Sequence, residues 1–172
     1  MAFEVAPANI DEAVLPGETP DAHVRRLAEA KARAVFAGAP GRPVLGADTV
    51  VVVEGQILGK PADDADAARM LRLLSGRSHE VLTGVCLVGP AEAGHYVRTE
   101  VALTAVEFAR LTEAEVAWYV ASGEAADKAG AYAIQGLASR FATRIQGSYS
   151  NVVGLPVALV YDLCKRAGIL IS

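Results

Sequence analysis

The feature that most constrains the fold is an apolar run of ten residues from Val44 to Val53. Its sequence, VLGADTVVVV, is rich in β-branched residues, which favour strands buried in a sheet. The Glu54-Gly55-Gln56 segment follows at once and is typical of a hairpin turn. Hydrophobic residues make up 52% of the 172 residues and charged residues 21%, so a sizeable core can be buried. The run therefore predicts a central strand inside a folded domain.

Helices and further strands alternate along the rest of the chain. We expect helices over residues 20–37, with Thr19 as N-cap, and over 63–76, 112–123 and 156–166. We expect strands over residues 3–6, 81–88, 97–108 and 141–145. Because hairpins occur among these elements, the pattern predicts an α/β fold, in one domain spanning residues 1–172. Its sheet is expected to be mixed and twisted, flanked by helices, and not purely parallel.

Charge and hydropathy exclude several classes of protein. The 16 basic residues against 20 acidic ones give a net charge of −4, which argues against a general nucleic-acid binder but allows a small anionic ligand. No uncharged apolar run approaches the roughly 18–20 residues of a membrane span, and the N-terminus lacks the features of a signal peptide. Cys86 and Cys164 stand alone in apolar segments and are expected to be buried free thiols. We therefore expect a soluble cytoplasmic protein without nucleic-acid or membrane partners.

Asp48 breaks the pattern of the central strand. An ionised carboxylate among apolar residues is costly unless it is paired, coordinated or part of a site. Gly46 and Ala47 remove side-chain bulk just before it and leave room for a ligand or a close backbone. One interpretation is an acid that bonds a neighbouring turn; the other is a general base or a metal ligand. We favour the functional interpretation.

Lys31 lies on the apolar face of the first expected helix. It follows Leu27 by four residues and precedes Val35 by four, which is helical spacing. A lysine on an inward face either extends its amine to solvent or meets an anion, and both alternatives stay open here. The other charged residues of the helix, Arg25, Arg26, Glu29 and Arg33, are expected to be solvated.

Two loops carry further polar candidates. Lys60 lies between Gly59 and Pro61, which would hold its ammonium toward a phosphate, although an exposed loop lysine is the simpler interpretation. Gln135 lies in the segment 127–136, which is rich in small residues, and its carboxamide can both donate to and accept from a base edge. An ordinary loop explains that segment equally well.

The three histidines and the large aromatics have structural interpretations. His79, at the start of an expected strand, is more typical of a structural residue than of a catalytic one. His23 and His95 show no metal-ligand spacing and are expected to face solvent, and Trp118 and Tyr119 are expected to be packing residues. Inward lysines and carboxylates beside a loop suited to a planar ligand indicate phosphate-ester or phosphoanhydride chemistry with a divalent cation.

A series of short motifs, taken together and in order, resembles the Maf family of nucleotide pyrophosphatases. Any one of these motifs is weak, but the ordered set is specific and covers nearly the whole chain. The motifs are Ile10-Asp11-Glu12, residues 28–32 (AEAKA), residues 46–51 (GADTVV), Gly59-Lys60-Pro61, residues 74–81 (LSGRSHEV), residues 127–132 (DKAGAY), Ile134-Gln135-Gly136, and Gly147-Ser148-Tyr149 before residues 153–156 (VGLP).

The resemblance implies two lobes around a central cleft, often as a homodimer, as in inosine triphosphatase-like folds. It implies hydrolysis of a nucleoside triphosphate to a monophosphate and pyrophosphate, with Mg²⁺ or Mn²⁺. Residues 77–79 and 147–149 resemble the subgroup that acts on dTTP and UTP. By family position, the catalytic residues are Asp48, Lys31, Lys60 and Glu12, the substrate-binding residues are Thr49, Gln135, Arg77 and Lys128, and the metal ligands are Asp48 and Glu12.

The resemblance also implies a difference at the N-terminus. In the family, a strand and a Ser-x-Ser-x-Arg-Arg loop precede the region that matches Phe3-Glu4-Val5, where this chain opens. We expect the missing arginines to weaken substrate binding, and the missing strand to expose a sheet edge. This difference motivates an alternative function, namely a non-catalytic nucleotide-binding or regulatory protein related to cell division.

Overall fold

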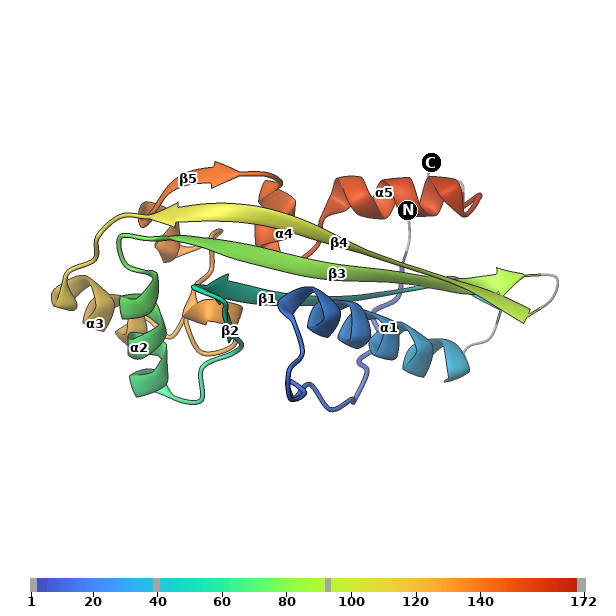
Figure 1. The fold of residues 1–172 in the computed structure, drawn as a ribbon, viewed down its shortest axis with the longest axis horizontal. Coiled ribbons are helices and arrows are strands. Elements are labelled where there is room, and N and C mark those ends of the chain that lie inside the picture. The colour runs from blue at the N-terminus through green and yellow to red at the C-terminus, as the bar shows by residue number, and fades with distance from the viewer. Residues whose placement is uncertain (1–2, 39–40, 92–93, 170–172) are drawn as a thin grey trace. The chain divides into compact units, whose positions relative to one another are not determined.

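The computed structural model describes residues 3–38, 41–91 and 94–169 (Figure 1). Within these residues, five strands form one sheet in the order β2-β1-β3-β4-β5. The strands are β1 (Val44–Val53), β2 (Gln56–Leu58), β3 (Ser78–Ala91), β4 (Gly94–Phe108) and β5 (Ala142–Gln146). The α-helices are α1 (Pro20–Gly38), α2 (Asp64–Leu74), α3 (Glu113–Ala121), α4 (Tyr149–Val153) and α5 (Val157–Arg166). The α/β fold class expected from the sequence is confirmed.

Neighbouring strands of the sheet run antiparallel (Figure 1). The hairpin between β1 and β2 pairs Val53 with Gln56. Glu54 and Gly55 both have positive φ, 50° and 78°, as a two-residue type I′ turn requires. The hairpin argument against a purely parallel sheet is therefore confirmed. Helices separate β1 from β3 and β4 from β5 along the chain, whereas the β1–β2 pair is joined directly by its two-residue turn.

The chain divides into two compact units. Unit 1 contains Met1–Asp48, Thr83–Ala102 and Gly154–Ser172, and unit 2 contains Thr49–Leu82 and Leu103–Val153. Strands β1, β3 and β4 each contribute residues to both units. Each unit has its own hydrophobic core.

The core of unit 1 packs helices on both faces of β3. Cys86 and Val88 pack with α1, whereas the alternate residues Val85 and Leu87 pack with α5. Gly84 lets α1 approach closely, because a Cβ there would collide with the carbonyl of Val24. Cys86 and Cys164 are buried free thiols, as the sequence predicts.

The core of unit 2 gathers α2, α3 and the strand ends of this unit around a group of aromatic residues. The ring centroid of Phe141 lies 6.2 Å from that of Phe108 and 5.6 Å from that of Tyr119. Thr112 and Glu115 form the capping box expected at the start of α3, and Asp63 caps α2. Local signals therefore place both helices correctly.

Two strand expectations need correction. Residues 3–15 have no regular secondary structure, so the strand expected over residues 3–6 is wrong. Phe3 and Val5 are 81% and 85% exposed, and a strand is stabilised only when a face is buried and its backbone is paired. Strands β3 and β4 extend further than residues 81–88 and 97–108, because pairing carries them through polar residues. Within the described residues, no helix combines the length and apolarity needed to cross a bilayer.

Candidate active site

The strongest candidate site in unit 1 is an ion-paired group of three side chains. The Nζ atom of Lys31 lies 2.7 Å from Oδ1 of Asp48 and 2.7 Å from Oε1 of Glu12. The exposed fractions of the side chains are 22% for Lys31, 9% for Asp48 and 49% for Glu12. Of the two interpretations of Lys31, the structure supports the one in which its amine meets an anion. The lysine joins two acids that lie far apart in the sequence.

Close packing of α1 on β1 creates this contact. Gly46 and Asp48 lie on the same face of the strand, because alternate residues point the same way. A Cβ at Gly46 would collide with the backbone of Ala28 and Ala32 in α1, so only glycine permits this approach. Lys31 lies on α1 beside these alanines and meets the carboxylate two residues beyond the glycine.

The two carboxylates determine the charge of Lys31. Burial of the side chain lowers the pKa of Lys31, but hydrogen bonds to Asp48 and Glu12 outweigh it, so the net pKa is raised. Lys31 is therefore an ammonium at neutral pH. It offers a fixed positive charge beside a buried carboxylate, which suits the binding of a phosphate group next to a base.

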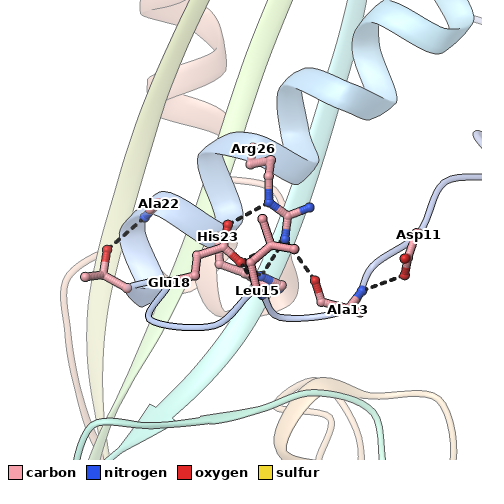
Figure 2. Close-up of polar contacts among 8 residues, drawn as sticks. Asp11, Ala13, Leu15, Glu18, Ala22, His23 and Arg26 are labelled. Atoms are coloured by element: carbon pink, nitrogen blue, oxygen red, sulfur yellow. Dashed lines mark hydrogen bonds and ion pairs between the residues drawn. The ribbon is translucent and has the colours of Figure 1, made fainter.

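A network on α1 and the preceding segment flanks this group (Figure 2). Arg26 donates hydrogen bonds to Glu18 and to the carbonyl of Ala13, one residue from Glu12. His23 is buried and its Nδ1 atom lies 2.9 Å from Glu18. The expectations that Arg26 is solvated and that His23 faces solvent are therefore wrong. The sequence did hold a signal for this network. His23 and Arg26 lie one helical turn apart, and Glu18 directly precedes the expected helix cap.

In unit 2, a turn joins two of the motifs predicted from the sequence. The amide of Gly130 donates to the carbonyl of Gly59, next to Lys60. Lys128 forms a 2.8 Å ion pair with Asp127, and it lowers the pKa of Asp127, with a smaller contribution from Lys60. Lys60 itself is exposed. The structure thus pairs Lys128 directly with Asp127, whereas Lys60 acts on the same carboxylate only through its charge.

The segment that carries Gln135 is held at both ends. The amide of Ala133 donates to the hydroxyl of Tyr119 at 3.0 Å, and the amide of Leu137 donates to Glu124 at 2.9 Å. Tyr119 also donates to Glu124, at 3.3 Å. Gln135 is exposed on this tethered turn. Sequence reasoning assigned Tyr119 to packing alone and missed Glu124, since neither bond joins residues at helical spacing.

The remaining candidates have varied surroundings. Thr49 is half-buried on β1 directly after Asp48. Arg77 is exposed and pairs with Glu54 of the hairpin at 2.9 Å. Trp118 packs its ring under the guanidinium of Arg140, but it is 42% exposed, so this packing lies at the surface and not in the core. Exposed His95 agrees with expectation.

His79 is structural, as the sequence indicates. Its Nε2 atom lies 2.8 Å from the hydroxyl of Tyr132, and its ring packs edge-on against Phe108 and Tyr132. Burial lowers the pKa of His79 to about 4, so the ring is neutral at physiological pH. The side chain acts as a neutral member of the aromatic core.

The carboxylates of Glu12 and Asp48 beside Lys31 are the candidate metal ligands. Across residues 3–38, 41–91 and 94–169, no group of three or more His, Cys, Asp or Glu side chains could hold a metal ion. Glu12 and Asp48 supply two carboxylates on one ammonium. Mg²⁺ takes one or two protein carboxylates when substrate phosphates supply further oxygens, so these residues fit a substrate-borne cation better than a permanent site.

Comparisons with known proteins agree with the motifs. The family model described as "Maf-like protein" matches residues 1–167. The dTTP/UTP pyrophosphatase of Koribacter versatilis (strain Ellin345) is 53% identical over 170 residues, covering 99% of this chain and 86% of that protein. The dTTP/UTP pyrophosphatase of Anaeromyxobacter dehalogenans (strain 2CP-C) is 55% identical over 168 residues, covering 98% and 84% respectively. A similar match, 51% identical, covers 98% of this chain and 86% of the dTTP/UTP pyrophosphatase of Geotalea uraniireducens (strain Rf4). This chain belongs to the Maf family.

Proposed function

We propose that this protein is a nucleoside triphosphate pyrophosphatase that hydrolyses dTTP and UTP to the monophosphate and pyrophosphate. The observation that carries the proposal is the Lys31 ammonium between Asp48 and Glu12. It occurs in a chain more than 50% identical to relatives named dTTP/UTP pyrophosphatase. A fixed cation beside a buried carboxylate suits water attack on a phosphate, because the carboxylate can accept a proton and the cation can stabilise negative charge on the phosphate oxygens.

We assign the general base to Asp48. Its carboxylate would accept the proton of a water molecule whose oxygen attacks the α-phosphorus, while the bond to the bridging oxygen breaks and pyrophosphate leaves. Lys31 would orient Asp48 and neutralise charge on the phosphate oxygens. Lys60 would contribute a second ammonium to the triphosphate. Asp48 is nine-tenths buried, which restricts competing solvent around the base.

A divalent cation fits this scheme as a companion of the substrate. Glu12 and Asp48 would hold Mg²⁺ or Mn²⁺ together with phosphate oxygens, and the cation would screen the charge of the triphosphate. We assign nucleotide selection to Thr49, Gln135, Arg77 and Lys128. Of these, exposed Gln135 has the donor and acceptor needed to read a pyrimidine edge. A homodimer stays a prediction.

The test measures pyrophosphate release from dTTP, UTP and CTP with Mg²⁺ or Mn²⁺. We expect metal-dependent turnover of dTTP and UTP, and a loss of kcat of about 100-fold or more in Asp48→Asn, because the base is removed. Asp162→Asn is the matched control, since it makes the same change at an exposed residue of α5. Unchanged turnover in Asp48→Asn would contradict the assigned base.

A second measurement on the same protein decides between catalysis and binding alone. A thermal melt with each nucleotide shows whether the folded protein binds it, because a ligand of the native state raises Tm. A nucleotide-induced rise in Tm without pyrophosphate release would overturn the proposal in favour of a non-catalytic nucleotide-binding protein.

A further inference from the structure

We propose that Arg26 and Glu18 form a positioning pair, here called the clamp. The clamp holds the segment 11–18 so that Glu12 reaches Lys31. The pair is built from α1 and the residue before its N-cap, both in unit 1. Its structural claim stands alone, whereas its consequence for catalysis rests on the proposed function. Arg26 and Glu18 are positioning residues and not catalytic ones. Both act through the backbone that carries Glu12.

One guanidinium holds the segment at two points (Figure 2). Nε of Arg26 donates to Oε1 of Glu18 at 2.6 Å, and Nη2 donates to Oε2 at 2.8 Å, which is the bidentate geometry specific to arginine. The same Nη2 donates to the carbonyl of Ala13 at 2.9 Å. Ala13 is adjacent to Glu12, and Glu18 is adjacent to the N-cap Thr19. Arg26 therefore ties the segment to the first turns of α1 at two positions, Ala13 and Glu18.

Apolar burial does not explain the position of this segment. Residues 11–17 are exposed and lack regular secondary structure. Glu18 is the exception, with a side chain only 8% exposed, and it also accepts from the amide of Leu15 at 3.1 Å. Hydrogen bonds from Arg26 first, and then from Leu15 and His23, hold the pKa of Glu18 well below its usual range against the opposing effect of burial. An ionised, almost buried carboxylate is thus the anchor of the segment.

The anchor matters because Glu12 is itself half exposed. Its carboxylate reaches Lys31 from a segment whose neighbouring carbonyl, at Ala13, is held by Arg26. Without that bond, the ordering entropy of the segment favours conformations in which Glu12 faces water. Lys31 would then keep Asp48 as its remaining carboxylate partner in this group, which changes the charge offered to a phosphate and its cation.

The first experiment measures the clamp without reference to activity. Hydrogen exchange followed by mass spectrometry compares wild type with Arg26→Gln, Glu18→Gln and the control Arg33→Gln. Arg33 lies on the same helix and forms an exposed i,i+4 pair with Glu29, so its loss changes the charge equally. We expect peptides that cover residues 12–18, where the amides of Ala13, Leu15 and Glu18 are hydrogen-bonded, to exchange at least tenfold faster in Arg26→Gln and Glu18→Gln, with residues 24–36 unchanged. Equal exchange in all proteins overturns the proposal.

The second experiment measures whether Arg26 acts through Glu12. Arg26→Gln, Glu12→Ala and the double variant are compared in kcat/KM for dTTP. We expect each single change to lower kcat/KM about tenfold and the double variant to be no worse than Glu12→Ala, because the clamp has nothing left to position. Losses that multiply in the double variant overturn the positioning role, since a general structural defect would add independently.

The two experiments separate the two proposals. If wild type releases no pyrophosphate from any nucleotide, the proposed function fails, while hydrogen exchange still decides whether the clamp exists. If Arg26→Gln does not fold, Arg26→Lys and Glu18→Gln replace it. Lysine keeps the charge but cannot span Glu18 and Ala13 together, so we expect it to restore the fold with exchange in residues 12–18 still raised.

Discussion

Single residues in this protein owe their properties to a few specific neighbours. Lys31 stays charged because two carboxylates outweigh the cost of its burial, whereas His79 stays neutral because burial acts on it with one hydroxyl as its hydrogen-bond partner. Burial disfavours the charged form of both side chains, yet Lys31 stays charged and His79 does not. The difference lies in whether opposite charge is within hydrogen-bond distance.

The lowered pKa of His79 leads us to expect a loss of stability in acid. Its pKa is about 4 in the folded state and about 6.5 in the unfolded chain, so between these pH values the unfolded state binds a proton that the native state does not. The free energy of unfolding should therefore fall as pH drops from 6.5 to 4, by up to about 3 kcal/mol from this residue.

Urea titrations at pH 7, 6, 5 and 4 test this. His79→Gln should show a flatter dependence of the free energy of unfolding on pH than wild type. His95→Gln, which changes an exposed histidine, should leave the wild-type slope. Equal slopes in wild type and His79→Gln would show that His79 is not the group responsible.

At the scale of elements, helices and turns place the candidate groups through close backbone contacts. Helix α1 carries Lys31 to β1 only because Gly46 admits it, and α3 contributes the Tyr119 hydroxyl that tethers the Gln135 turn. Both arrangements depend on bonds or contacts between elements that are distant in the sequence. Small changes at these contacts should therefore affect function and stability together.

Gly46→Ala tests the approach of α1 to β1. The added methyl group would overlap the backbone of Ala28 and Ala32, which cannot rotate away, so we expect a loss of about 2–3 kcal/mol in unfolding free energy and weaker pyrophosphate release. Gly38→Ala is the control, because open space surrounds that glycine at the end of α1. A stability of Gly46→Ala equal to that of the control would mean that the helix can move without cost.

Tyr119→Phe tests the tether of the Gln135 turn. The ring stays packed against Phe141, but Ala133 loses its hydroxyl partner. We expect the ratio of kcat/KM for dTTP to that for CTP to change about three- to tenfold, with a stability loss of about 1 kcal/mol. Tyr161→Phe, at an exposed residue of α5, is the control. An unchanged ratio would remove the turn from nucleotide selection.

At the scale of the whole molecule, three strands contribute to both compact units, so each unit is assembled from segments that are far apart in the chain. Unit 1 contains Glu12, Lys31 and Asp48, whereas Lys60, Lys128 and Gln135 belong to unit 2. The ordered motifs that identify the family are thus distributed over both units. The sequence order of the motifs predicts membership of the family, but it does not predict which motif residues touch.

The sequence by itself predicted α1, α2, α3, α5 and the longer strands, together with the inward placement of Lys31 and Asp48. Caps, hairpin turn and apolar spacing act between residues at most a few positions apart, so they can be recognised without a partner. Only the tertiary structure decided that Lys31 meets both Glu12 and Asp48, that Arg26 is a clamp, and that residues 3–6 form no strand. These outcomes depend on which distant segment comes within hydrogen-bond distance or shields a surface from water, and nothing in the local pattern encodes that partner.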